Sequence, residues 1–379
     1  MPIPHLIAAA DFDRFPGLLA EWRAGTPGSG LLMLLPEAER DRLPALQAAC
    51  RGAGVPLVGA VFPAIVTDAG FATGGAWAFR FDAMPPRFLL DGLDAGTGAA
   101  AERIAGAARG ALDEAAGAGG SGGAPTLFLV FDGMLPDIAS QLLGVYEHLR
   151  DAVRYGGVNA GSETFQPMPC LFDEERTIGN GVLGLLLPPA TRLIARHDYP
   201  VSRGLMKATS TEGNRIDRID GRPAFAVYQE VIGKEYGVEL TRENFYDYAV
   251  HFPFGVVTAL DVLVRIPVAL SEDGALFCVG EVPPNCMLRL LRAPSLEDSA
   301  CVDGIAGALG PAVAHRPLVT FYCAGRRMHF GAAAVSEMER LAEMTGATGV
   351  AGALTLGEID SEEALGMPRF HNATVVCLA

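Results

Sequence analysis

The sequence predicts an α/β fold with mixed α+β character, in which sheets of parallel and antiparallel strands are flanked by helices. Strand-like apolar runs alternate with helical periodicity in the first part of the chain, short strands crowd its middle, and the alternation returns towards the C-terminus. The 379 residues, half of them apolar and 19% charged, supply material for a sizeable core. Because sheet and helices occur on both sides of Asp220, we expect two modules, residues 1–220 and residues 221–379.

In the first module, apolar runs bounded by Gly and Pro favour buried strands, and the stretches between them carry apolar residues at helical spacing. The strand–helix–strand order of residues 30–62 predicts a parallel pair joined by a crossover helix. The predicted strands cover residues 30–35, 55–62, 76–81, 126–131, 181–187, 192–197 and 206–219. The predicted helices cover residues 36–50, 99–117 and 136–153, and the glycine-rich stretch 116–125 is predicted to be a surface loop.

The second module opens at Pro223, which stands at a plausible first helical position. The same patterns predict further helices and strands down to the C-terminus. The predicted helices cover residues 223–232, 242–250, 296–309 and 332–344. The predicted strands cover residues 262–268, 275–282, 287–291, 317–323, 349–357 and 370–378.

Composition excludes several classes of partner. Acidic residues exceed basic ones by 15, and Lys207 and Lys234 are the only lysines, so direct binding to nucleic acid or to anionic membranes is not expected. The apolar runs fall short of the ~20 residues that span a bilayer, and the N-terminus lacks a secretory signal, so we expect no transmembrane segment and a cytoplasmic location. Seven scattered cysteines without CxxC spacing favour reduced, mostly buried thiols.

Two motif matches in the glycine-rich stretch do not indicate a site. Residues 117–122 fit GxGxxG and residues 119–123 fit GxSxG. Both motifs need a strand before them and a helix after them, whereas here a helix precedes and a strand follows. The acidic run Asp173 to Glu175 is typical of a solvated loop, and no metal-binding cluster of cysteines and histidines occurs. We therefore predict no catalytic residue and no enzyme.

Eight segments, taken in their order and spacing, resemble the FIST N and FIST C domains, which are sensory modules of bacterial signal transduction. The resemblance covers most of the chain from about residue 30 onward, and no single segment carries it. The first four are GGVNAGSETF (156–165), VLGLLL (182–187), HDYPV (197–201) and KATSTEGNRIDRIDGRPAFAVY (207–228). The last four are HFPFGV (251–256), FYCAGR (321–326), LTLGEI (354–359) and FHNATVV (370–376).

The resemblance implies a cytoplasmic sensor of a small ligand. A protein with only these two modules is similar to the NosP subgroup, which binds haem b, senses nitric oxide and modulates a histidine kinase or a cyclic-di-GMP enzyme. Haem needs a neutral imidazole that reaches iron from an apolar pocket. Of the seven histidines we favour His197, which ends an apolar strand and precedes Asp198, a possible orienter of its ring. The alternative is a structural histidine at a strand end.

A second hypothesis keeps the sensor but replaces haem with a small polar metabolite such as an amino acid. Gly157, Asn159, Gly161 and Ser162 form a segment that can cradle a polar group or make a tight turn. Strand ends in the second module add further candidate ligand-binding residues, namely Arg326, Glu358 and His371. A third hypothesis is an enzyme that uses Cys323 with a nearby histidine, which a fully buried, unreactive Cys323 would contradict.

Overall fold

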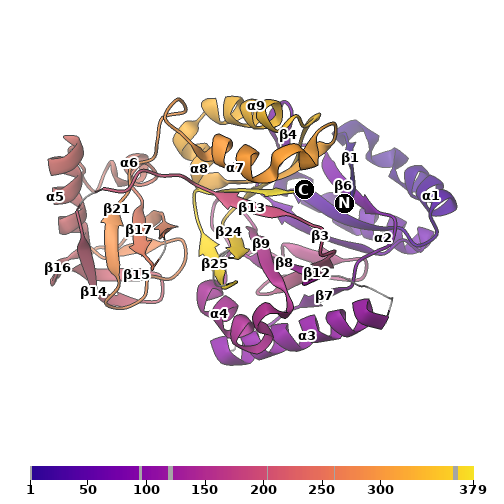
Figure 1. Cartoon of the computed structure of the whole chain (residues 1–379), viewed down its shortest axis with the longest axis horizontal. Coiled ribbons are helices and arrows are strands. Elements are labelled where there is room, and N and C mark those ends of the chain that lie inside the picture. The colour runs from indigo at the N-terminus through magenta and orange to yellow at the C-terminus, as the bar shows by residue number, and fades with distance from the viewer. Residues whose placement is uncertain (1, 94–95, 118–122, 203, 260, 362–365) are drawn as a thin grey trace.

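Three sheets form a large lobe, and a fourth sheet forms a small lobe beside it (Figure 1). The computed structural model describes residues 2–93, 96–117, 123–202, 204–259, 261–361 and 366–379. The small lobe is built from residues 206–291, and the rest of the described chain forms the large lobe. Residues 118–122, which are half of the predicted loop 116–125 and most of both rejected motif matches, lie outside the described residues.

The first sheet of the large lobe holds the predicted parallel pair. β2 runs parallel to β3, and the crossover between them contains a helix, as predicted. The other pairs in this sheet are antiparallel. Its strands, in spatial order, are β1 (Ile3–Ile7), β6 (Ala76–Phe81), β2 (Gly30–Pro36), β3 (Leu57–Phe62), β10 (Leu171–Asp173) and β11 (Thr177–Ile178). Its helices are α1 (Phe15–Gly25) and α2 (Leu43–Ala53), preceded by 3₁₀ turns at Ala9–Arg14 and Glu37–Arg42.

The second sheet combines strands from both ends of the chain. β8 and β9 run parallel at its centre, and β24 from near the C-terminus pairs with β9. Its strands, in order, are β25 (Pro368–His371), β24 (Glu358–Ser361), β9 (Arg154–Ala160), β8 (Thr126–Asp132), β12 (Val182–Leu187) and β7 (Arg87–Leu90). Its helices are α3 (Thr97–Gly117) and α4 (Ile138–Leu149), and a 3₁₀ turn follows at Arg150–Ala152.

The third sheet also joins the two halves of the sequence. β22 and β23 are parallel, β4 from the first module pairs with β23, and β13 pairs with β26. Its strands, in order, are β13 (Leu193–Arg196), β26 (Val375–Leu378), β22 (Pro317–Cys323), β23 (Gly349–Thr355), β4 (Ile65–Thr67) and β5 (Gly70–Ala72). Its helical segments are α7 (Cys301–Leu309), the 3₁₀ turn Gly310–Val313, α8 (Ala324–Phe330) and α9 (Ala333–Thr345).

The small lobe is an antiparallel sheet with its own apolar core. The strand predicted at residues 206–219 is a hairpin, β14 and β15, within this sheet. Its strands, in order, are β18 (Val262–Arg265), β17 (Phe254–Val257), β21 (Met287–Leu290), β14 (Met206–Glu212), β15 (Arg215–Ile219), β20 (Leu276–Cys278) and β19 (Pro267–Leu270), with β16 (Arg222–Pro223) paired to β15. Its helices are α5 (Ala224–Tyr236) and α6 (Phe245–Ala249).

The core of the large lobe lies where its three sheets meet. The ring of Phe321, from the third sheet, lies 6.4 Å from that of Phe62 in the first sheet and 5.5 Å from that of Phe128 in the second. All seven cysteines are free thiols, and six of them are buried, as predicted. None of the helices in the described part of the chain is long and apolar enough to cross a membrane.

Two sequence-based expectations were wrong. The single strand expected at residues 370–378 is two strands in different sheets, because Ala373 has a φ of +59°, which breaks the extended backbone. Likewise, the segment from Gly156 is neither a turn nor a loop at its start but the body of β9. The expected module boundary at residue 220 stays a prediction, and Asp220 itself lies inside the small lobe, between β15 and β16.

Candidate ligand-binding site

Four of the FIST-like segments meet at the carboxyl ends of β9, β22 and β23. The backbone N–H of Asn159 donates to the carbonyl of Gly357 at 2.8 Å, and that of Leu356 donates to the carbonyl of Asn159 at 3.0 Å. The N–H of Cys323 donates to the carbonyl of Thr374 at 3.2 Å. Segments separated by up to 200 residues therefore share one small region, and the carboxyl edge of parallel strands is a frequent place for ligands.

Arg326 is the centre of a buried polar network. Its Nε and Nη2 atoms donate to the two carboxylate oxygens of Glu337 at 2.8 and 2.5 Å. Nη1 donates to the carbonyls of His197 and Ala373 at 3.0 and 3.1 Å, and Nη2 also donates to Ser299 Oγ at 3.1 Å. Because a guanidinium has five N–H groups, these bonds occupy all of them. Arg326 thus holds the end of β13 to α9 and to residue 373, and no donor remains for a ligand.

Glu358 and Cys323 form a second buried pair below the same strand ends. Burial raises the pKa of Glu358 to about 8, although Thr355 Oγ1 donates to its carboxyl at 2.6 Å. The carboxyl is therefore mostly protonated at neutral pH. Burial also raises the pKa of the Cys323 thiol, and the nearby Glu358 adds to that shift. A protonated thiol that is 2% exposed does not suit a nucleophile, so the geometry gives the enzyme hypothesis no support.

The predicted glycine segment packs strands together and does not line a cavity. Gly157 lies between β8 and β24, and a Cβ at this position would stand 1.9 Å from the carbonyl oxygen of Leu129. Gly161 has a φ of +129°, and its N–H donates to the carbonyl of Val61. The Ser162 hydroxyl is bonded to that of Thr164, whereas the buried side-chain oxygen of Asn159 has no hydrogen-bond partner among the described residues. Only the end of this segment, at Glu163 and Phe165, reaches a cavity.

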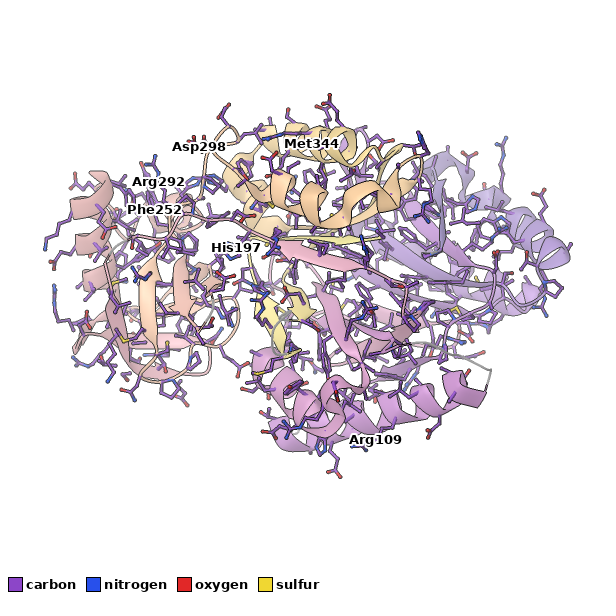
Figure 2. All side chains as sticks on the ribbon, in the orientation of Figure 1. Arg109, His197, Phe252, Arg292, Asp298 and Met344 are labelled. Carbon is purple, nitrogen blue, oxygen red and sulfur yellow. The ribbon has the colours of Figure 1, made fainter. Side chains whose placement is uncertain are left out.

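His371 and His197 lie close together, with ring centroids 6.4 Å apart. Nε2 of His371 is 2.9 Å from Asp360 Oδ1, and its buried Nδ1 has no hydrogen-bond partner in the part of the chain that the structure describes. Burial and the neighbouring His371 lower the pKa of His197 to about 4, so its ring is neutral. His197 stands just beyond β13, where the chain leaves for the small lobe (Figure 2).

His197 fits haem ligation poorly. Its Nδ1 accepts the N–H of Tyr199 at 3.0 Å, so in the neutral ring Nε2 carries the hydrogen. Neither nitrogen then offers a free electron pair to iron. The side chain is 8% exposed and lines neither of the two cavities described next. The residues around His197, as arranged here, do not fit haem.

The small cavity, of about 240 Å³, lies between the lobes beside the convergent strand ends. The large lobe contributes Glu163, Phe165, Cys323 and Asn372, and the small lobe contributes α6 and the start of β19. Asn372 joins the two walls, because its Oδ1 accepts the N–H of Ile266 at 3.2 Å. Most of the lining is apolar, and the polar groups stand at the floor and the rim.

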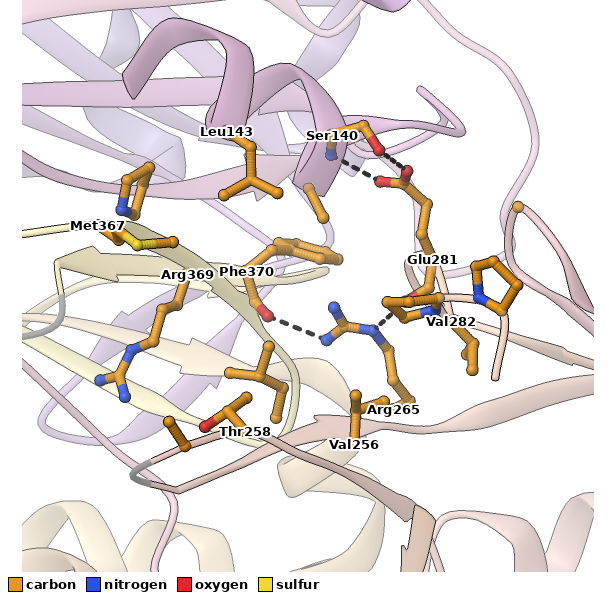
Figure 3. Close-up of a pocket in the computed structure, with 17 residues that line it drawn as sticks. Ser140, Leu143, Val256, Thr258, Arg265, Glu281, Val282, Met367, Arg369 and Phe370 are labelled. Carbon is orange, nitrogen blue, oxygen red and sulfur yellow. Dashed lines mark hydrogen bonds between the residues drawn. The ribbon is translucent and has the colours of Figure 1, made fainter. Parts of the chain in front are cut away.

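The large cavity, of about 580 Å³, also has walls from both lobes (Figure 3). Glu281 reaches from the small lobe to the first turn of α4, where its Oε2 accepts the N–H of Ser140 at 3.0 Å and its Oε1 bonds the Ser140 hydroxyl. Arg265 reaches in the other direction to the carbonyl of Phe370 at 2.9 Å. No group of three or more potential metal-binding side chains occurs in the described part of the chain.

Models of two known domain families match most of the chain. A model of the FIST N domain matches residues 31–222, and a model of the FIST C domain matches residues 224–361. The chain belongs to the FIST family. FIST domains are sensor domains of signal transduction that bind small ligands, so this FIST protein has a sensor role, as the resemblance predicted. No curated protein matches the sequence.

Sequence reasoning missed Arg265, the buried cation of the large cavity. The signal was present, since Arg265 interrupts the otherwise apolar run VLVRIPV at residues 262–268. A charge inside a buried strand is rare unless it has a partner or a function.

Proposed function

We propose that this FIST protein senses a small polar metabolite, such as an amino acid, in the small cavity, without haem. The observation that carries the proposal is that FIST segments far apart in sequence converge on a cavity whose walls come from both lobes. Its volume, about 240 Å³, is below the ~300–1,000 Å³ of pockets for drug-sized ligands, which favours a smaller molecule.

The signal would arise from a change in how the lobes sit against each other. A ligand in this cavity touches Glu163 or Phe165 on the large lobe and β19 on the small lobe, so it binds best at one distance between the lobes. It stabilises that arrangement by the difference between its affinities for the two arrangements of the lobes. The exposed rim residues Phe165, Tyr246 and Met328 surround the same opening, so occupancy can alter the surface that a partner contacts.

Calorimetry and thermal unfolding against a panel of amino acids test this proposal. We expect saturable stabilisation of the wild type by at least one compound. Val268→Trp should abolish it, because an indole fills the cavity that Val268 lines. Ala269→Trp is the matched control, since Ala269 is the next residue of the same strand but does not line the cavity, so this substitution should leave binding intact. Equal binding by Val268→Trp and wild type, or no stabilisation by any compound, would refute the proposal.

Three points stay predictions from the resemblance: haem b bound through His197, nitric oxide sensing, and modulation of a histidine kinase or a cyclic-di-GMP enzyme. The haem prediction has its own test, an absorption spectrum of the purified protein supplied with haem. Because both ring nitrogens of His197 are engaged, we expect no Soret band that depends on this residue. A band that shifts with nitric oxide and disappears in His197→Ala would overturn the haem-free proposal.

A further inference from the structure

The large cavity contains an arginine that forms no ion pair within the described residues, although its guanidinium lies over the Phe370 ring, 5.4 Å from the centroid. Arg265 is 2% exposed, and its bonds go to neutral carbonyls: Nε to Glu281 at 2.8 Å, and Nη1 to Val264 and Phe370 at 3.0 and 2.9 Å. No carboxylate of the described residues lies within 4.0 Å of its nitrogens, and its Nη2 donates no hydrogen bond there (Figure 3).

Arg326 provides an internal comparison. Both arginines are almost completely buried, but Arg326 has a two-pronged bond to Glu337 and uses every donor, whereas Arg265 keeps one nitrogen open. Burial lowers the pKa of Arg265 to about 10, which leaves it charged at neutral pH. A buried charge without a counter-charge is costly, so a bound anion would be favoured here.

The acids nearest to this cavity are already engaged. The Glu281 carboxylate accepts two hydrogen bonds from Ser140 at the start of α4. Asp360 is bonded through both oxygens to Arg369, which also lines the cavity. Nη2 of Arg265 is therefore an open donor for an anion, whereas the carboxylates of Glu281 and Asp360 already accept hydrogen bonds from the protein. Around Arg265 the walls are apolar, including Leu143, Val256 and Phe370.

We propose that the large cavity is a second ligand site, in which Nη2 of Arg265 binds the carboxylate of a molecule with an apolar body. The body packs against Leu143, Val256 and Phe370. A zwitterion fits less well than a monoanion, because its ammonium group would have to leave water for a cavity with mostly apolar walls. This site goes beyond the proposed function, since it is separate from the small cavity and takes a different ligand class.

The first test uses wild-type protein and matched pairs of probes: phenylacetate against phenylacetamide, and hexanoate against hexanamide. The acid and amide of each pair have the same apolar body and differ in charge. Because a hydrogen bond to a charged group contributes about 1.5–3 kcal/mol, we expect calorimetry to show about 10- to 100-fold tighter binding of an acid than of its amide. Equal affinities, no binding by either acid, or tighter binding by phenylalanine would overturn the inference.

The second test uses variants with phenylacetate as the probe. Arg265→Gln should weaken binding about 10- to 100-fold, whereas Arg292→Gln, which removes an exposed arginine that does not line the cavity (Figure 2), should leave it unchanged. Folded Arg265→Gln with wild-type affinity would overturn the inference. If that variant does not fold, the affinities of the acid and amide pairs for the wild type decide whether the inference holds. Val268→Trp separates the two proposals, because it should block the small cavity and still bind phenylacetate.

Discussion

Glu358 illustrates how burial sets the chemistry of single residues in this protein. Its carboxyl is fully buried, accepts hydrogen bonds from Thr355 Oγ1 and the Thr374 N–H, and has a pKa raised to about 8. Glu337 is almost as buried, yet the bonds from Arg326 outweigh the effect of burial and hold its pKa below the usual value. The difference between these two carboxyls comes from their partners.

Glu358 should make folding stability fall as the pH rises. Between pH 4.5 and about 8 the folded state keeps a proton that the unfolded state releases, so stability decreases across this window. A full proton is equivalent to about 1.4 kcal/mol per pH unit. With urea unfolding from about pH 6.5 to 8, the stability of the wild type should fall relative to that of Glu358→Gln, whose amide stays neutral. Parallel profiles would contradict the assignment.

The histidines whose pKa is lowered by burial, namely His5, His197, His251 and His329, change stability in the opposite direction. The pKa of His197 is lowered to about 4 from 6.5, so the unfolded state binds the extra proton. Its contribution to stability is therefore lost as the pH falls below about 6.5. Because the wild type and Glu358→Gln carry the same histidines, the difference between their stability profiles reports on Glu358.

At the scale of elements, glycine in β9 and β23 lets parallel strands approach closely. A Cβ at Gly157 would stand 1.9 Å from Leu129 O in β8, and one at Gly352 would stand 1.7 Å from Thr320 O in β22. The same contact therefore recurs in two sheets of the large lobe. These glycines position the strand ends below which Glu358 and Cys323 meet.

Gly157→Ala should destabilise the protein by about 1–3 kcal/mol or more, because a backbone strand has to move to admit the methyl group. Gly110→Ala is the control, since Gly110 lies on the exposed side of α3 with nothing within 4 Å of a Cβ, and helix propensity predicts a gain of about 0.5–1 kcal/mol. Denaturant unfolding of both variants checks the pair. A Gly157→Ala protein as stable as wild type would show that β8 and β9 can separate at no cost.

At the scale of the whole molecule, the two FIST modules are not separate in space. β24 pairs with β9, β23 pairs with β4, and β13 pairs with β26, so strands from the C-terminal module complete two sheets that the N-terminal module begins. The small lobe, in turn, takes β14 and β15 from before residue 220 and α5 from after it.

A fragment of residues 1–222, the FIST N match with its preceding residues, should therefore not fold cooperatively. Without the C-terminal module, β9, β4 and β13 present unpaired edges, which promote aggregation. Circular dichroism during thermal unfolding should show no sigmoidal transition for the fragment, with the full chain as the control. A cooperative transition with dispersed amide resonances would show that the modules fold independently.

The sequence by itself determined the local elements and the family. Apolar runs bounded by Gly and Pro predicted β2, β3, β8 and β12 nearly at their observed bounds. The order of the eight segments indicated FIST domains. These features depend on neighbours along the chain, since strand and helix periodicity are local properties.

Only the tertiary structure decided which residues meet and what each polar group does. Arg265 ends β18 and Arg326 lies in the first turn of α8, yet Arg326 pairs with Glu337 whereas Arg265 faces a cavity and has no carboxylate partner among the described residues. His371, Glu358 and Asn159 converge because β24 pairs with β9 across some 200 residues of sequence. Pairing over such distances is set by the packing of whole sheets, and no local pattern encodes the partner.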